Sequence, residues 1–248
     1  MSTRNIVIVT AIAVIVVLGI WMSKSSTPAE TTSNTVPPPA QMNPSSETPP
    51  PDQAMTPAAE TINNCTRMFD REKLKTATVD IANRFVTFDV RNFGNIQIEL
   101  YNTDAPKTVE NFLRLVNSGF YDCLTFHRVS KGFVIQGGDP LGTGTGGESA
   151  FGGEFADELN PDTTSYKTGY VKGVVAMANH GPNTNSSQFF IMIGDVALPH
   201  AYTIFGKVVD GLGVAEKIGQ VEIIPQLGPT DGMPKEKVVI EKATISTK

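Results

Sequence analysis

The pattern of apolar and polar positions divides this 248-residue chain into three parts: an apolar N-terminal run, a polar proline-rich stretch, and a long region of short alternating segments. The run Ile6–Met22 consists almost entirely of Ile, Val, Ala and Leu and has no polar face. About 17 such residues are the lower limit for a helix that crosses a bilayer. The pattern of residues 1–22 therefore predicts either a membrane anchor or a signal peptide that is cleaved.

The flanks of this run favour the anchor. The end of the run, Gly19–Met22, contains bulky residues. It lacks the two small residues, one position apart, that mark a signal-peptide cleavage site. Arg4 precedes the run, and positive charge tends to stay on the cytoplasmic side, although Lys24 follows it. We therefore expect a membrane-anchored protein whose remaining chain is extracytoplasmic. If the segment is cleaved, the alternative is a secreted or periplasmic protein.

The next two segments predict little regular structure. Residues 23–60 carry clustered prolines among Ser, Thr, Ala and Glu. They predict a disordered linker, because they cannot bury enough apolar area to offset the entropy of ordering. Residues 61–84 form an N-terminal extension of the domain that follows. Its apolar residues between Cys65 and Leu74 are compatible with a short amphipathic turn or helix, and Val79–Ile81 with the start of a strand.

From residue 85 onward, short alternating segments predict strands. Phe85–Val90 and Ile96–Leu100 alternate with period two around the turn Asn92–Asn95, which predicts a hairpin. Phe126–Pro140 has the pattern of strand, tight turn and strand, and Val238–Ile245 that of a closing strand. Many short strands with few helices are typical of a sandwich or a barrel.

Two helices are expected between these strands. Pro106 is a favoured first-turn residue, and either Thr103 or Asp104 is expected to cap the helix that starts there. Gly119 is expected to end it. A shorter helix is predicted at Val214–Ile218.

Composition narrows the chemistry. The net charge of -5 and the absence of any lysine or arginine run argue against nucleic acid as a partner. Cys65 and Cys123 are the only cysteines, and they form either a disulfide, if the domain is extracytoplasmic, or two free thiols. His127, His180 and His200 lack metal-ligand spacing, so we expect no metal, and we expect His127 to be hydrogen-bonded within the fold.

The pair Arg128 and Gln136 is the strongest candidate for a functional site. The two residues are expected on paired strands among aromatic and aliphatic neighbours. A buried arginine needs partners, and a glutamine on the neighbouring strand can hold it in one geometry. Such a fixed fork of donors beside an apolar surface suits an uncharged substrate that carries a carbonyl or an amide. The alternative is an ordinary exposed arginine on an edge strand.

Three strings carry a resemblance to a known family: FHRVSKGFVIQGGDP at Phe126–Pro140, GVVAMANHGPNTNSSQFFI at Gly173–Ile191, and FGKV at Phe205–Val208. In this order they closely resemble the cyclophilin family of peptidyl-prolyl cis/trans isomerases, and the resemblance covers Phe85–Ile245. It implies that residues 85–248 form a mainly β domain, a closed eight-stranded antiparallel β-barrel capped by two α-helices. It also implies catalysed rotation about Xaa-Pro bonds in unfolded or exported chains, without a cofactor. The alternative is a non-catalytic module that binds proline peptides.

The resemblance assigns roles to individual residues. Arg128 matches the catalytic arginine, and Gln136 matches the residue that orients it and contacts the substrate backbone. Further positions match those that contact substrate: Phe133, Val134, Phe190 and Leu198 as walls of the proline pocket, Ala178 and Asn179 as the edge that binds the peptide backbone, and Gly144, Gln188 and Tyr202 around them.

Departures from the family pattern change some expectations. Tyr202 replaces a common histidine, and its ring and polar tip should preserve function. Ala197 stands where the best-known members carry the tryptophan associated with cyclosporin binding, so we expect weak cyclosporin binding. His180 replaces a small residue, and it either alters substrate preference or is an ordinary exposed loop histidine. We expect a monomer that binds proline-containing polypeptides and reaches the membrane through its N-terminal helix.

Overall fold

The computed structural model describes residues 60–62, 64–82 and 84–247. The predicted membrane segment at residues 1–22 and nearly all of the predicted linker lie outside these ranges. Within the described ranges, none of the helices is long and apolar enough to cross a membrane.

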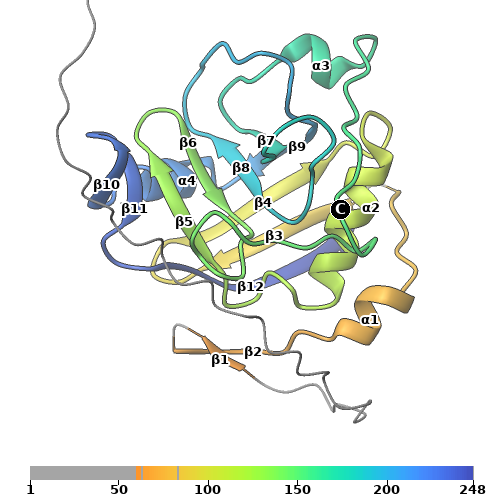
Figure 1. The fold of residues 1–248 in the computed structure, drawn as a ribbon, viewed down its shortest axis with the longest axis horizontal. Helices are drawn as coiled ribbons and strands as arrows, with labels where there is room; N and C mark the ends of the chain where they lie inside the picture. The colour runs from red at the N-terminus through yellow and green to blue at the C-terminus, as the bar shows by residue number, and fades with distance from the viewer. Residues whose placement is uncertain (1–59, 63, 83, 248) are drawn as a thin grey trace, which may run out of the picture. The chain divides into compact units, whose positions relative to one another are not determined.

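Antiparallel strands close into an eight-stranded barrel, as the resemblance implied (Figure 1). The order around the barrel is β5 (Thr125–Ser130), β12 (Val238–Thr247), β3 (Arg84–Val90), β4 (Gly94–Leu100), β9 (Ile204–Asp210), β7 (Val174–Met177), β8 (Phe189–Met192) and β6 (Val134–Gly137). The barrel closes because β6 pairs with both β8 and β5.

Two hairpins lie outside the barrel. One joins β10 (Ile223–Gly228) to β11 (Asp231–Pro234), and β11 pairs antiparallel with the end of β5, at Val129 and Ser130. The other joins β1 (Glu60–Ile62) to β2 (Cys65–Arg67) in the N-terminal extension. Both hairpins add elements that the eight-stranded barrel does not require.

The strands predicted from period-two alternation are confirmed. β3 and β4 form the expected hairpin, and their inward residues Phe88, Ile96 and Ile98 are fully buried. The interpretation of Val79 and Ile81 as the start of a strand is wrong. These residues belong to no strand and instead pack, partly buried, against the core. Two apolar residues are too short a pattern to distinguish a strand from an irregular segment that covers the core.

The two predicted helices are present as α2 (Pro106–Asn117) and α4 (Leu212–Ile218). The short helix that was one interpretation of the extension is present as α1 (Arg71–Thr76), which buries Leu74, and a further short helix, α3 (Thr164–Thr168), is also found in the described ranges. α2 buries an apolar stripe of Val109, Phe112, Leu113 and Val116 in the core. Gly119 follows its end with φ of +75°, a left-handed conformation that favours glycine.

The predicted side-chain cap of α2 by Thr103 or Asp104 is wrong. The N-cap residue makes no side-chain capping bond. Instead, the Glu158 carboxylate accepts hydrogen bonds from the backbone N–H groups of Lys107 and Thr108, at 3.0 and 2.8 Å. A carboxylate also complements the positive end of the helix dipole. The cap therefore comes from a residue far along the chain, which local sequence patterns do not reveal.

Residues on the two faces of β7 and β8 enter two different apolar clusters. Val175, Met177 and Phe189 point into the main core inside the barrel. Their neighbours Ala176 and Phe190 belong to a second cluster on the outer face. Successive side chains of a strand point to opposite faces of the sheet. A strand that is apolar throughout must therefore be covered on both of its faces. The second cluster therefore marks a place where the outside of the barrel is also apolar.

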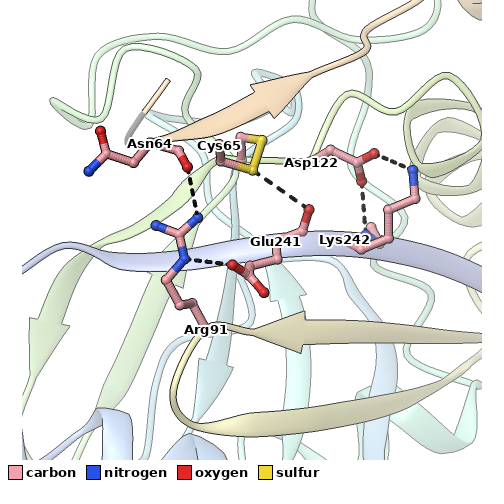
Figure 2. The surroundings of a disulfide bond; sticks show 8 residues. Asn64, Cys65, Arg91, Asp122, Glu241 and Lys242 are labelled. Carbon is pink, nitrogen blue, oxygen red and sulfur yellow. Dashed lines mark hydrogen bonds and ion pairs between the residues drawn. A yellow bond between two sulfur atoms is a disulfide. The ribbon is translucent and has the colours of Figure 1, made fainter. Parts of the chain in front are cut away.

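A disulfide between Cys65 and Cys123 fastens the N-terminal extension to the domain (Figure 2). Figure 2 shows the bond lying beside β12, where Arg91 pairs with Glu241 at 2.6 Å. The extension is held further by Arg67, whose guanidinium donates to the Phe120 carbonyl oxygen at 2.9 Å and lies over the Phe120 ring. The extension thus has covalent, polar and aromatic contacts to the barrel domain.

Candidate active site

One row of paired residues crosses four neighbouring strands. Arg128 in β5 pairs with Gln136 in β6, Gln136 pairs with Phe190 in β8, and Phe190 pairs with Ala176 in β7. Directly paired residues project from the same face of a sheet. The row therefore runs from a charged group through an amide to an apolar floor on the outer face of the barrel.

Arg128 and Gln136 contact each other as the sequence predicted. Arg128 Nη1 donates to Gln136 Oε1 at 2.9 Å, and Gln136 Nε2 donates to Gln188 Oε1 at 2.9 Å. Gln188 Nε2 in turn donates to the carbonyl oxygens of Gly144 and Gly146, at 3.0 and 2.6 Å. This chain of amides runs from the glycine-rich loop to the guanidinium and fixes the side chains of both glutamines.

Asp231 is a further member of the site that the sequence analysis missed. Its two carboxylate oxygens accept from Arg128 Nε at 2.9 Å and from Nη2 at 2.7 Å. The bonds from Arg128 lower the pKa of Asp231 below its usual value, and burial only partly opposes this effect. Asp231 follows a Gly-Pro-Thr turn, so nothing in its local pattern distinguishes it from an ordinary turn aspartate.

The predicted walls of the proline pocket lie together. Val134, Phe190, Phe133, Leu198 and Tyr202 all belong to the second apolar cluster, on the outer face of the barrel. Two of them, Val134 and Phe190, are buried, whereas the other three are partly exposed. The Phe190 and Tyr202 rings meet edge to face, with centroids 5.6 Å apart. The arrangement is a buried floor with a partly exposed apolar rim.

The segment Ala178–Asn179 borders this cluster. The backbone N–H of Ala178 donates to the Gln188 carbonyl oxygen at 2.9 Å, and the Asn179 side chain donates to the Ala201 carbonyl oxygen at 2.8 Å. Within the described part of the chain, the backbone N–H and C=O of Asn179 have no hydrogen-bond partner. An extended peptide can therefore pair with the backbone at this position, as in β-augmentation.

A cleft of about 790 Å³ lies next to this edge, and Gln136 and Gln188 form part of its lining. Arg71 of the N-terminal extension also lines the cleft and pairs with Glu148 at 2.7 Å. The extension therefore reaches the neighbourhood of the candidate site.

Two of the histidines, His180 and His127, differ in their surroundings. His180 lines the same cleft, is 74% exposed and pairs with Glu154 at 3.0 Å, so it is an exposed loop residue beside the site. The prediction that His127 is hydrogen-bonded is wrong, since it is buried and neither ring nitrogen has a partner. Burial lowers the pKa of His127 below that of a free imidazole. Among the described residues, no group of three or more His, Cys, Asp or Glu could hold a metal ion.

Comparisons with known proteins agree with this geometry. The family described as "Cyclophilin type peptidyl-prolyl cis-trans isomerase/CLD" matches residues 85–245. The chain is 51% identical over 131 residues to peptidyl-prolyl cis-trans isomerase ppi1 of Schizosaccharomyces pombe, covering 52% of this chain and 82% of that protein. It is 48% identical over 141 residues to human peptidyl-prolyl cis-trans isomerase-like 1, covering 56% and 82%.

A solved structure of a cyclophilin type peptidyl-prolyl cis-trans isomerase from Cryptosporidium parvum is also similar. The match has a TM-score of 0.58 at 37% identity, and it covers 66% of this chain and 98% of the other chain. A second crystal structure of that protein, in the presence of the dipeptide Ala-Pro, has a TM-score of 0.57 at 36% identity and covers 66% and 99%. The matched family region begins in β3 and ends in β12, the strands that neighbour each other in the barrel.

Proposed function

This chain belongs to the cyclophilin-type peptidyl-prolyl cis-trans isomerase family, and from that premise we propose that Arg128 is its catalytic residue. The reaction is rotation about an Xaa-Pro peptide bond. Its barrier is about 18–20 kcal/mol, because twisting the bond breaks amide resonance. A catalyst accelerates the rotation if it binds the twisted amide more tightly than either planar form.

The apolar cluster is the proposed seat of the proline ring. Phe133, Leu198 and Tyr202 form the partly exposed rim around Phe190, and a proline ring needs no hydrogen-bond partner there. The peptide backbone beside the proline would pair with the free N–H and C=O of Asn179. With the ring and one flank held, the other flank is free to rotate about the imide bond.

Arg128 is the proposed donor to the twisted bond. A guanidinium has five N–H donors. Gln136 and Asp231 accept three of them, which leaves one N–H on each terminal nitrogen for a substrate. In the twisted state the prolyl nitrogen becomes pyramidal and gains a lone pair that accepts a hydrogen bond. A planar imide nitrogen lacks that lone pair, so this bond favours the transition state.

The single observation that carries this proposal is the register row in which Arg128, Gln136 and Phe190 face the same way. The test is the Arg128→Ala variant in a protease-coupled assay or by exchange NMR with a proline tetrapeptide. Arg114→Ala is the matched control, because Arg114 is similarly covered and pairs with Glu110 at 3.1 Å away from the row. We expect Arg128→Ala to lose most activity with its fold intact and the control to keep it. Peptide binding without accelerated exchange in the unmodified protein would instead indicate a non-catalytic binder.

We also propose that the protein is a membrane-anchored, extracytoplasmic isomerase that acts on unfolded or newly exported chains. The apolar run Ile6–Met22 and the proline-rich residues 23–60 support this location. The pairing of Cys65 with Cys123 supports it independently, because disulfides persist mainly in oxidising compartments. Membrane fractionation and sequencing of the mature N-terminus test the proposal. A soluble protein that begins after the apolar run would show cleavage, and a cytoplasmic protein would overturn the proposal.

A further inference from the structure

The guanidinium of Arg128 is held from two sides. Gln136 Oε1 accepts one hydrogen bond from Arg128 Nη1. This bond by itself leaves the guanidinium plane free to turn. Asp231 accepts two parallel bonds along the opposite edge, from Nε and Nη2. Such bidentate pairs fix the orientation of the guanidinium plane as well as its position. The Asp231 side chain is 15% exposed, so water competes little for its oxygens.

The β10–β11 hairpin places Asp231 at this point. β11 lies antiparallel to β5, and Asp231 pairs with Ser130, which is two residues from Arg128 on the same face. Diagonal neighbours on one face lie within reach of long side chains. The backbone N–H of Lys131 donates to the Thr230 carbonyl oxygen at 2.8 Å and anchors the hairpin beside this pair.

Gly232 keeps the hairpin in this register. A Cβ atom at Gly232 would lie 2.1 Å from the Ile224 carbonyl oxygen on the facing strand. The two strands of the hairpin can therefore approach each other here only around a glycine. The carboxylate beside Arg128 thus comes from a fixed element rather than from a mobile loop.

We infer that Asp231 is a positioning residue, which holds the guanidinium so that its two remaining N–H donors face the substrate. This inference rests on the proposed catalytic role of Arg128. An arginine side chain has many rotamers, and ordering them during the reaction would raise the barrier. The carboxylate orders them beforehand. It also offsets part of the positive charge, which the site tolerates because the substrate imide is uncharged.

The experiment measures kcat and KM of Asp231→Ala in the full chain. We expect kcat to fall about 10- to 100-fold, the range for a misplaced catalytic group, while KM changes little. Asp231→Glu should recover part of the loss, since it retains a carboxylate. Asp231→Asn should recover less, because its NH₂ group cannot accept from a guanidinium N–H. Glu222→Ala is the control for the loss of an ion pair at the same hairpin, because the exposed Glu222 pairs with Lys235 at 2.9 Å.

A double-mutant cycle separates positioning from a structural effect. If Asp231 acts through Arg128, then Asp231→Ala should cost nothing further in the Arg128→Ala background. Equal losses in both backgrounds, or wild-type kcat in Asp231→Ala, would overturn the inference. Full activity of Arg128→Ala would instead overturn the proposed function, so the two failures are distinguishable. Near-ultraviolet circular dichroism of each variant shows whether the fold is retained.

Discussion

Breaking the disulfide between Cys65 and Cys123 should destabilise the protein by an amount that follows from the length of the loop it closes. The two cysteines are 58 residues apart. In the chain-entropy model, a bond that closes a loop of this length stabilises the folded state by about 4 kcal/mol, because it removes conformations from the unfolded chain. A domain of this size loses about 2–4 °C of Tm per kcal/mol. We therefore expect reduction to lower Tm by roughly 8–16 °C.

The remaining contacts of the N-terminal extension limit what else is lost. The Arg67 bond to the Phe120 carbonyl oxygen and the buried Leu74 side chain do not depend on the disulfide. The site row is built from β5, β6, β7 and β8, none of which carries either cysteine. We therefore expect the reduced protein to keep its isomerase activity below its lowered Tm.

The assay is thermal unfolding with and without reductant, repeated on Cys65→Ala/Cys123→Ala. The double variant should unfold near the Tm of the reduced protein and should not respond to reductant, which makes it the control. Mass spectrometry after alkylation reports the state of the thiols. Two alkylatable thiols in the native, unreduced protein would refute the disulfide, and an unchanged Tm on reduction would refute the entropic reasoning.

Three further predictions follow from the fold and the site. Glu158→Ala should destabilise the protein by about 1–2 kcal/mol in urea unfolding, since it removes the cap of α2. Burial opposes ionisation of Asp139, but backbone N–H groups outweigh it and lower its pKa. The free energy of unfolding of Asp139→Asn in urea should therefore be lower than that of the wild type at neutral pH. The difference between the two should shrink as pH falls below about 3.9. Cyclosporin should inhibit weakly in the isomerase assay and more tightly in Ala197→Trp, so nanomolar inhibition of the unmodified protein would contradict this expectation.

The elements that the sequence predicted best are those formed by neighbouring segments. The turn between Phe126 and Pro140 is short enough to fix the register of β5 and β6, so it alone brings Arg128 opposite Gln136. Alternating apolar residues likewise predicted β3 and β4, because one face of each must be buried. The roles expected of the pocket residues came from the family resemblance, and the structure places those residues in one cluster.

The features that the sequence missed join distant segments. Glu158 lies 50 residues from the α2 residue Thr108 that it contacts, and Asp231 lies 103 residues from Arg128. Local patterns around these carboxylates are those of ordinary loop residues. His127 shows the converse: a histidine beside a catalytic candidate was expected to have a partner, but the barrel wall buries it without one.

By itself, the sequence determined the strand pattern, the hairpin that aligns Arg128 with Gln136 and the family to which the barrel belongs. Only the tertiary structure decided which carboxylate orients the guanidinium, which one caps α2, and that the two cysteines meet. The physical reason is that short turns fix local register from nearby residues alone, whereas contacts between distant segments depend on how the closed barrel and its added hairpins pack.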